Sequence, residues 1–420
     1  MGIALRPFLD LLPYRLDQVL VGRNLNRLRI AVRRARSAPK PPLSTPTATL
    51  SQRRLFVDVS VISKHDAGTG IQRVVRSLAL NLVHEAKLQR WDLRFVAATR
   101  RRAYHEVSWF QCSSLSFEPI EARAGDVFVG LDYALDGVRH HARQLARFRH
   151  NGGRLWFLVH DLLPLEKPEW FSRNTVIRYK AWLRIMAGIA DGFLCNSSQT
   201  ETELREALDR EYGLTEGYST KVLPMGYCIA EAAVATTVAP RLPDVQVPYF
   251  LMVGTLEPRK GHADILDAFD ALWGEGMKEA LVLVGRRGWQ VDCLRERIVG
   301  HPLNGTKLFW FDDVEDAELA EFYAASQGAI IASHAEGFGL PLIEALGYGK
   351  PVLARDIPVF RQHEAYGVRY FPVDADPSTL ARCIRHWSAQ VQKGAVEVSG
   401  PETSWGHSAR ELLQALSQSA

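Results

Sequence analysis

The sequence predicts an α/β protein built from two doubly wound domains, and three observations lead to this prediction. With 420 residues, the chain is long enough for two domains of ordinary size. Short apolar runs typical of buried strands alternate with longer runs typical of helices, which is the order of a parallel sheet covered on both faces. A loose segment at 230–247, rich in Ala, Thr and Val, divides the series in two.

Positive charge is concentrated at the start of the chain, although the formal net charge is only +4. Between Met1 and Lys40 there are nine Arg or Lys and two Asp. This asymmetry indicates a basic arm and not a surface for nucleic acid, so no nucleic-acid partner is expected. Residues 1–50 are therefore assigned to a basic N-terminal arm and a linker, because the stretch after Lys40 is rich in Pro, Ser and Thr.

Apolar residues within the arm recur at near-helical spacing, among them Leu16, Leu20, Leu28 and Val32. A basic amphipathic helix can lie on an anionic membrane surface. The alternative is a solvated or self-associating helix, and the sequence does not choose between the two. Peripheral contact with an anionic membrane through residues 1–40 is therefore one of two expectations.

Cysteine usage and the lack of long apolar runs indicate a cytoplasmic protein. The five cysteines are scattered, with no Cys-x-x-Cys pair, which argues against a disulfide framework or a zinc site and fits a reducing compartment. No run approaches the ~18 apolar residues that a membrane span needs. Arg6, Asp10 and Arg15 interrupt the pattern of a secretory signal. If the arm binds lipid, the expected place is the inner face of the plasma membrane.

The predicted first domain, 51–235, opens with a strand at 55–60, a loop containing Gly68-Thr69-Gly70 and a helix at 71–88. In such a unit the loop after the strand faces a ligand, and glycines let the backbone approach it closely. The third glycine of a dinucleotide fingerprint is absent, so a plain structural turn is the alternative. Further strands are predicted at 126–130, 154–159, 192–195 and 221–226, and helices at 138–149, 182–189 and after 196–198.

The predicted second domain, 236–403, repeats this plan. Its strands are predicted at 249–253, 280–285, 307–311, 328–332 and 351–354, and its helices at 262–273, 316–325 and 381–391. Two doubly wound domains of this kind would leave a cleft between them for a ligand.

The stretch from Ser333 to Ala345 carries the strongest functional signal. Pro341 suits the first turn of a helix, so Glu336 should lie on a loop and Glu344 inside the helix. The N–H groups and dipole of a helix start bind anions, whereas carboxylates accept hydrogen bonds from sugar hydroxyls. The stretch therefore predicts a ligand with both phosphate and hydroxyl groups, such as a nucleotide-sugar.

This pattern, Glu-Gly-Phe-Gly-Leu-Pro-x-x-Glu-Ala, resembles the signature of retaining glycosyltransferase family 4. The resemblance implies the GT-B fold, two Rossmann-like domains with a cleft between them, and a last helix at 404–420 that crosses back onto the first domain. It implies that Glu336 contacts the donor sugar and that Glu344 holds the nucleotide ribose. The residues between them are expected to line the donor site, namely Gly337, Phe338, Gly339 and Leu340.

A second loop, Gly-Thr-Leu-Glu-Pro-Arg-Lys-Gly at 254–261, places two cations after a predicted strand. Arg259 offers a fork for two phosphate oxygens, and Lys260 offers a point charge. Cations aimed at the charge that develops on a departing diphosphate stabilise the transition state more than the ground state. Such a pair is usually a solvated turn. Because the loop resembles the diphosphate-binding loop of the family, Arg259 and Lys260 are expected to be catalytic.

His160 and Asp161 end the predicted strand at 154–159. Similar enzymes carry a histidine here against the donor sugar, so His160 is assigned to sugar positioning and charge stabilisation. Asp161 is expected to bind the donor or to orient the imidazole. The alternative is a structural histidine satisfied within the fold. By the same resemblance, Gly68, Thr69 and Gly70 are expected to lie against the donor diphosphate and the acceptor.

The basic loop at 285–289 resembles a loop that lies near the nucleotide in similar transferases. Gly285 and either Arg286 or Trp289 are therefore expected to contact the donor. The alternative is a basic turn with a surface tryptophan.

No metal ion and no cofactor are expected, since the nucleotide-sugar is a substrate. The Asp-x-Asp sequence at 374–376 is interpreted as a turn and a helix N-cap. The chain has no His-Glu-x-x-His motif or similar metal-binding cluster.

The motifs are most similar to those of bacterial mannosyl- and rhamnosyltransferases of surface-polysaccharide and lipopolysaccharide synthesis. The resemblance implies a GDP-sugar donor, transfer of mannose or rhamnose with retained configuration, and an oligosaccharide or polyprenyl-linked acceptor. The alternatives are a UDP-sugar-dependent transferase, a nucleotide-sugar epimerase, a sugar-phosphate synthase or phosphorylase, and a non-catalytic binder. An epimerase would isomerise free UDP-sugar, a phosphorylase would need phosphate, and a binder would give no transfer.

Overall fold

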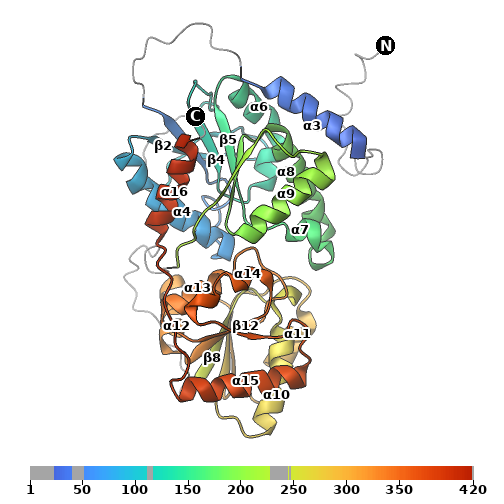
Figure 1. Ribbon diagram of the computed structural model, residues 1–420, viewed down its shortest axis with the longest axis vertical. Coiled ribbons are helices and arrows are strands. Elements are labelled where there is room, and N and C mark those ends of the chain that lie inside the picture. The colour runs from blue at the N-terminus through green and yellow to red at the C-terminus, as the bar shows by residue number, and fades with distance from the viewer. Residues whose placement is uncertain (1–22, 40–51, 111–116, 228–244, 246, 419–420) are drawn as a thin grey trace. The chain divides into compact units, whose positions relative to one another are not determined.

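The computed structural model describes residues 23–39, 52–110, 117–227, 245 and 247–418 (Figure 1). The chain divides into two compact units, and each unit takes its residues from more than one stretch of the chain. The first unit comprises residues 1–67, 78–223 and 409–420, and the second comprises residues 68–77 and 224–408. The boundary expected at 235/236 lies outside the described residues.

Within the described residues, the first unit has a seven-stranded sheet in the order β3-β2-β1-β4-β5-β6-β7. Edge strand β3 runs antiparallel to β2, and the other neighbouring pairs are parallel. The strands are β1 (Arg54–Asp58), β2 (Asp92–Ala97), β3 (His105–Glu106), β4 (Val127–Gly130), β5 (Arg154–Val159), β6 (Gly192–Cys195) and β7 (Ser219–Val222). Their helices are α3 (Arg23–Ser37), α4 (Gly70–Leu88), α5 (Leu135–His140), α6 (Ala142–His150), α7 (Leu163–Glu166), α8 (Arg173–Ile189), α9 (Ser198–Tyr212) and α16 (Trp405–Gln418). The central strands are buried along their length, as parallel strands between two helix layers must be.

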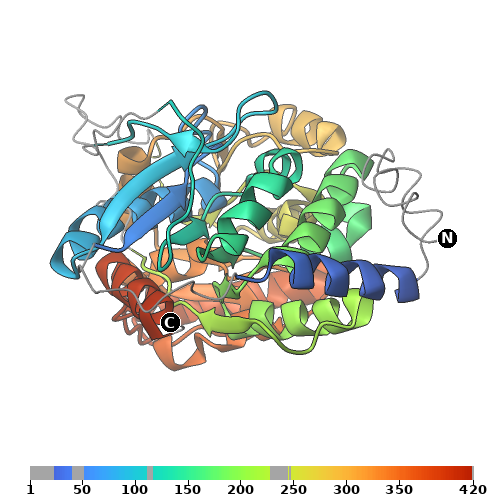
Figure 2. The same ribbon diagram turned by 90° about the horizontal axis from the view of Figure 1, so that it is seen from above.

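Helix α3, the described part of the basic arm, packs against α6, α8 and α9 (Figure 2). Ile30 is 3% exposed and belongs to the core of the first unit. The guanidinium group of Arg34 donates to the carbonyl oxygens of Ala187 (3.1 Å) and Ala190 (3.0 Å) at the end of α8. One face of α3 is therefore built into the fold. The part of the arm that precedes Arg23 lies outside the described residues.

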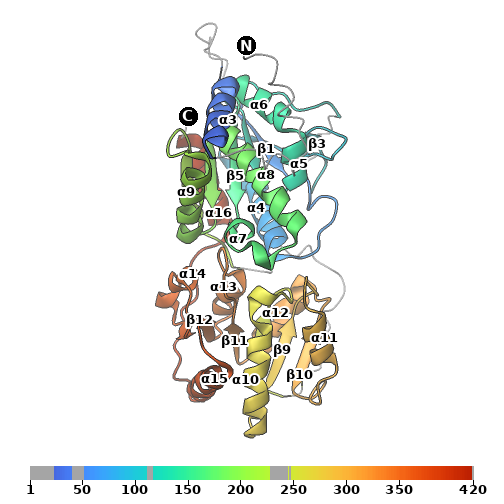
Figure 3. The same cartoon turned by 90° about the vertical axis from the view of Figure 1, so that its right-hand side faces the viewer.

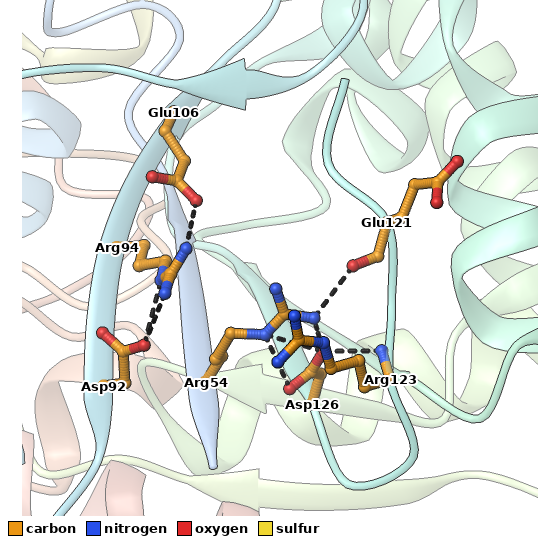
Figure 4. A network of polar contacts seen from close by, with 7 residues as sticks. All are labelled: Arg54, Asp92, Arg94, Glu106, Glu121, Arg123 and Asp126. Carbon is orange, nitrogen blue, oxygen red and sulfur yellow. Dashed lines mark hydrogen bonds and ion pairs between the residues drawn. The ribbon is translucent and has the colours of Figure 1, made fainter. Parts of the chain in front are cut away.

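Ion pairs join neighbouring strands of the first unit, at the amino ends of β1 and β4 and between β2 and β3 (Figure 4). Arg54, the first residue of β1, donates to both carboxylate oxygens of Asp126, which immediately precedes β4. On the neighbouring strands, Arg94 pairs with Asp92 (2.7 Å) and Glu106 (2.6 Å). This edge of the sheet is closed by contacts within the protein, whereas the predicted site residues follow the carboxyl ends of the strands.

The second unit is built on a six-stranded sheet of described residues, in the order β10-β9-β8-β11-β12-β13, and all its neighbouring pairs are parallel (Figure 3). The strands are β8 (Tyr249–Val253), β9 (Ala280–Val284), β10 (Leu308–Phe311), β11 (Gly328–Ile331), β12 (Val352–Arg355) and β13 (Arg369–Phe371). The helices are α10 (His262–Gly274), α11 (Asp292–Val299), α12 (Asp316–Ala325), α13 (Leu340–Gly347), α14 (Pro358–Arg361) and α15 (Pro377–Gln392). Helix α10 packs against α15, and α13 contacts β11 and β12.

Several elements differ from the expectation: the helix expected at 182–189 begins at Arg173, and β3, β13 and α11 were not expected. The single helix expected at 138–149 is wrong, because the backbone leaves helical geometry at His141 (φ −114°, ψ 22°) and separates α5 from α6. The imidazole of His141 contacts the carbonyl oxygen of Thr99 (2.6 Å) instead of lying along a continuous helix. Strand β2 was not expected, because Asp92 and Arg94 interrupt its apolar pattern.

The Asp-x-Asp sequence does form a turn and N-cap, since the carboxylate of Asp376 accepts from the N–H of Thr379 (2.7 Å).

Candidate functional site

A cluster of opposite charges in the second unit begins in the loop after β8. Pro258–Lys260 form a single turn of 3₁₀ helix, and Gly261 follows with a φ of +73° before α10 begins. A Cβ atom at residue 261 would lie 2.3 Å from the carbonyl oxygen of Ala332, so this close approach requires glycine. The turn thus fixes Arg259 and Lys260 beside the loop that follows β11.

Glu336 lies on that second loop and pairs with both cations. The Nζ of Lys260 contacts Oε1 of Glu336, and Nη1 of Arg259 lies 3.2 Å from Oε2. The hydroxyl of Ser333 donates to Oε1 (2.7 Å). The side chains of Arg259, Lys260 and Glu336 are only 16, 12 and 11% exposed, so water screens these charges weakly.

The ionisation of this cluster follows from burial and charge pairing together. Burial alone would raise the pKa of Glu336, but the charges of Lys260 and Arg259 outweigh it and hold that pKa at about 2. Burial lowers the pKa of Lys260, and Glu336 opposes this shift. Glu336 is therefore a carboxylate at neutral pH, which can accept hydrogen bonds but cannot donate one.

The second carboxylate of the motif, Glu344, is 2% exposed and lies inside α13. The guanidinium group of Arg73 contacts both of its oxygens, and the hydroxyl of Tyr323 donates to Oε2 (2.9 Å). Burial raises the pKa of Glu344 to about 7, while Arg73 opposes the shift. Glu344 is thus held in place by two partners that belong, like itself, to the second unit.

The Gly-Thr-Gly loop caps the start of α4, the helix that carries Arg73. The N–H of Gln72 donates to the Thr69 hydroxyl, and the Thr69 N–H donates to Oε1 of Gln72, each at 3.3 Å. This reciprocal pairing is a capping box. Gly68 has a φ of +62°, a left-handed conformation that favours glycine. Apart from its chain neighbours and the backbone of its own helix, no described atom lies within 4 Å of a Cβ built on Gly70.

The remaining residues predicted in the second unit also follow strand ends. Gly285 comes directly after β9, and a Cβ there would lie 2.0 Å from the carbonyl oxygen of Gly254. Arg286 pairs loosely with Asp313 (3.4 Å), and Trp289 is 40% exposed. Gly337, Phe338, Gly339 and Leu340 form the turn into α13, with Gly339 at its N-cap (φ +93°).

His160 and Asp161 lie at the carboxyl end of β5 in the first unit. The Nε2 of His160 donates to the carbonyl oxygen of Leu131 (3.0 Å), and the carboxylate of Asp161 accepts from the N–H of Leu163 (3.1 Å). Burial lowers the pKa of His160 to about 4. A neutral imidazole supplies a hydrogen bond and no positive charge. The hydrogen bond to Leu131 is what the structural alternative expects, and the role of His160 toward a donor sugar stays a prediction.

No group of three or more His, Cys, Asp or Glu side chains in the described ranges is arranged to hold a metal ion. Nor does any helix in this part of the chain combine the length and apolar character needed to cross a membrane.

Comparison with known proteins places the charged cluster in a family. Residues 238–393 match the family described as "Glycosyl transferases group 1". The chain carries a glycosyl transferases group 1 domain. This domain contains Arg259, Lys260, Glu336 and Glu344.

Curated relatives extend the likeness beyond residues 238–393. The chain is 35% identical over 382 residues to the serotype-specific mannosyltransferase WbdA of Escherichia coli, a match that covers 87% of this chain and 45% of WbdA. It is 37% identical over 113 residues to O-antigen chain mannosyltransferase B of Escherichia coli, covering 26% of this chain and 29% of the relative. The chain therefore spans less than half the length of the WbdA proteins that it matches.

A solved structure has a similar fold. HepE of Anabaena, in complex with UDP and glucose, superposes with a TM-score of 0.59 at 17% identity, covering 87% of this chain and 100% of HepE. At this identity the likeness bears on the fold alone. The expected GT-B fold of two Rossmann-like α/β domains is confirmed.

The structure brings together only some of the residues predicted for the site. Arg259, Lys260 and Glu336 form one cluster, and the Gly-Thr-Gly loop is linked to Glu344 through Arg73. Sequence reasoning missed Arg73 and Tyr323, which contact Glu344, and Asp316, which pairs with Arg73 (3.4 Å). The one local signal for Arg73 was its place one turn after the Gly-Thr-Gly loop.

Proposed function

We propose that the protein transfers a hexose from a nucleotide-sugar to an acceptor hydroxyl. The observation that carries this proposal is the buried cluster of Arg259, Lys260 and Glu336, which follows the carboxyl ends of β8 and β11. Two cations beside a carboxylate suit a ligand with phosphate groups and sugar hydroxyls. Negative charge develops on the diphosphate as the sugar–phosphate bond breaks, and the cations stabilise that charge.

The donor in this proposal is GDP-mannose or a related GDP-sugar. Its support is that WbdA and O-antigen chain mannosyltransferase B are both named as mannosyltransferases. The acceptor is an oligosaccharide or a polyprenyl-linked saccharide, and the product belongs to a cell-surface polysaccharide. Glu344 holds the nucleotide ribose, and Glu336 accepts hydrogen bonds from the donor sugar.

Transfer proceeds with retention, by substitution on the face of the sugar from which the diphosphate departs. The bond from the anomeric carbon to the phosphate oxygen breaks while the bond to the acceptor oxygen forms. The departing phosphate oxygen takes the proton of the acceptor hydroxyl, so no separate base is needed. Arg259 and Lys260 neutralise the diphosphate, a task that a divalent cation performs in other transferases.

A donor panel tests this function directly. The purified chain is incubated with GDP-mannose, UDP-glucose or dTDP-rhamnose and a polyprenyl-linked saccharide, with or without EDTA, and products are identified by mass spectrometry and NMR. We expect a mannosylated acceptor with an α linkage from GDP-mannose, at an initial rate that EDTA does not change. Isomerised free sugar nucleotide, an inverted linkage, or activity that returns only with added Mg²⁺ or Mn²⁺ would each contradict a part of the proposal.

We also propose that the basic arm, residues 1–40, holds the protein at an anionic membrane near its acceptor. The support is the outward face of α3, where Leu25, Leu28 and Val32 are 41, 60 and 39% exposed. The exposed Arg27 and Arg36 lie on the same helix, and no acidic residue occurs in α3. Exposed leucines flanked by arginines suit the interface of an anionic bilayer.

Sedimentation with vesicles tests the role of the arm. Leu28→Glu should reduce binding to phosphatidylglycerol vesicles at least tenfold, while phosphatidylcholine vesicles bind neither protein. Leu88→Glu, at a leucine of α4 that is 64% exposed, is the matched control and should leave binding unchanged. Equal vesicle binding by the Leu28→Glu variant and the unmodified chain would exclude this face of α3.

A further inference from the structure

Side chains that we assign to different parts of the donor form ion pairs within the protein. Lys260 and Arg259 are assigned to the diphosphate, and Glu336 is assigned to the sugar. Yet Glu336 contacts Lys260 through one oxygen and Arg259 through the other (3.2 Å). The carboxylate of Glu336 therefore occupies N–H groups of Lys260 and Arg259 that would otherwise bind the diphosphate.

The pairing matters because the side chains of the cluster are largely shielded from water. Removing the partner of a charge costs more free energy in a site where the side chains are 11 to 16% exposed than it does at the surface. A nucleoside diphosphate that takes both cations would leave Glu336 with the Ser333 hydroxyl as its remaining donor among these contacts (2.7 Å). A nucleotide-sugar brings hydroxyl groups that donate to the carboxylate as it is released.

We propose that Glu336 stands in for the donor diphosphate in the ligand-free chain and thereby makes the site select nucleotide-sugar over nucleoside diphosphate. This inference rests on the proposed function. Donor binding exchanges the internal ion pairs for phosphate contacts and gives Glu336 a new partner in the sugar. After transfer the sugar is gone, Glu336 competes again for Lys260 and Arg259, and release of the nucleoside diphosphate is favoured.

The alternative is that Glu336 only orients the cations. Lysine has three N–H donors and arginine has five, so both could bind phosphate while keeping Glu336. In that arrangement, removing the carboxylate charge would disorder the cations and weaken phosphate binding. The two arrangements therefore predict opposite changes in affinity for a nucleoside diphosphate.

Calorimetric titration of Glu336→Gln decides between them. GDP and UDP are titrated into the unmodified chain, and the one that binds is used as the probe, together with its mannose or glucose conjugate. We expect Glu336→Gln to bind the nucleoside diphosphate about tenfold tighter than the unmodified chain. The preference for the nucleotide-sugar over the nucleoside diphosphate should fall by at least the same factor. Unchanged or weaker binding of the nucleoside diphosphate would overturn the inference.

Glu257→Gln is the matched control. Glu257 pairs with Nε of Arg259 (2.8 Å) on the same loop, so its removal deletes an equal charge. This variant should change the affinities for nucleoside diphosphate and nucleotide-sugar by the same factor. If it loses the preference for nucleotide-sugar as Glu336→Gln does, the effect is a general one of charge and the inference fails.

Two further measurements keep the outcomes distinct. Circular dichroism and thermal unfolding verify that Glu336→Gln is folded. If it is not, Glu336→Asp replaces it, because the shorter carboxylate cannot span both cations. Glu336→Asp should show a smaller change in affinity for the nucleoside diphosphate, in the same direction. If the unmodified chain binds neither nucleotides nor their sugar conjugates, the proposed function and this inference both fail. If it binds them and the variants match it, the inference alone fails.

Discussion

Lys260 is the residue on which the chemistry of the proposed transfer depends most directly. Its ammonium group is held in a buried position by one turn of 3₁₀ helix, where burial lowers its pKa and Glu336 opposes the shift. A positive charge that is fixed before the reaction stabilises the departing diphosphate without reorganising. Loss of the Lys260 ammonium group should therefore lower the rate of transfer and not merely the affinity for the donor.

Lys260→Ala should lower kcat by about 10²- to 10³-fold, the loss typical of one missing group in a preorganised oxyanion site. Steady-state transfer from GDP-mannose measures kcat and KM separately. Arg287→Ala is the control, because Arg287 lies in the next loop, pairs with Asp292 and has a side chain that is 53% exposed. A Lys260→Ala variant that alters KM and keeps kcat would show that Lys260 binds the donor without stabilising the transition state.

His262 leads to a prediction about stability. It is 1% exposed, and neither ring nitrogen has a hydrogen-bond partner among the described residues. Burial lowers its pKa to about 3, whereas an unfolded histidine titrates near 6.5. As pH falls below 6.5, the unfolded chain binds a proton that the folded chain excludes, so this histidine makes the fold less stable.

His262→Leu should therefore be at least as stable as the unmodified chain at pH 7, since it removes an unsatisfied buried polar group. The difference in free energy of unfolding should then grow in favour of the variant by roughly 1.4 kcal/mol for each pH unit below 6.5. Urea denaturation at pH 7 and pH 5 measures it. A constant difference at the two pH values would show that His262 is accessible to protons in the folded state.

At the scale of elements, α3 is attached to the first unit by side-chain donors. Arg34 donates to the carbonyl oxygens of Ala187 and Ala190, which lie at the end of α8 and lack further N–H donors from a continuing helix. In the reverse direction, Arg149 donates to the Ser37 hydroxyl (3.0 Å). The basic composition of α3 thus serves the fold through Arg34, while other arginines remain exposed.

Arg34→Ala should destabilise the first unit by about 1–3 kcal/mol, because it leaves these carbonyl oxygens without a donor. Arg36→Ala removes the same charge from an exposed position of the same helix and should change stability by less than about 0.5 kcal/mol. Urea denaturation of both variants gives the comparison. Equal stability of the two variants would mean that α3 contributes no specific contacts.

Elements with a strong local pattern were the predictable part of the fold. The helix expected at 316–325 matches α12, which begins at a capping box of Glu315 and Glu318. The strand expected at 249–253 matches β8, which is a short continuous apolar run. At the break between α5 and α6, His141 contacts Thr99, which is 42 positions away, and no local pattern marks this contact.

The candidate site divides in the same way. Arg259, Lys260 and Glu336 lie in motifs with recognisable spacing, and the structure pairs them. The contact of Arg73 with Glu344 joins residues 271 positions apart, so no local pattern could predict it. The environment of His160, which keeps its imidazole neutral, likewise depends on the burial that the whole first unit provides.

At the scale of the whole molecule, the chain enters each unit more than once. Helix α4 begins in the second unit and continues in the first, and α16 likewise contributes to both. Leu412, Leu413 and Leu416 of α16 are fully buried in the first unit. One cut in the chain therefore cannot separate two complete units, and ligand effects are best measured on the intact protein.

Thermal unfolding of the intact protein with GDP tests where the donor binds. Arg259, Lys260, Glu336 and Glu344 all belong to the second unit, so GDP should stabilise that unit in particular. At 100 times its Kd, a ligand that binds only the folded state adds about 2.7 kcal/mol to the free energy of unfolding. In differential scanning calorimetry, GDP should raise the transition temperature of the second unit and leave that of the first unit unchanged. Lys260→Ala should show a much smaller increase at the same GDP concentration, because the variant has a higher Kd for GDP. An equal rise in the variant would place GDP away from Lys260 and would contradict the assignment of the diphosphate to this loop.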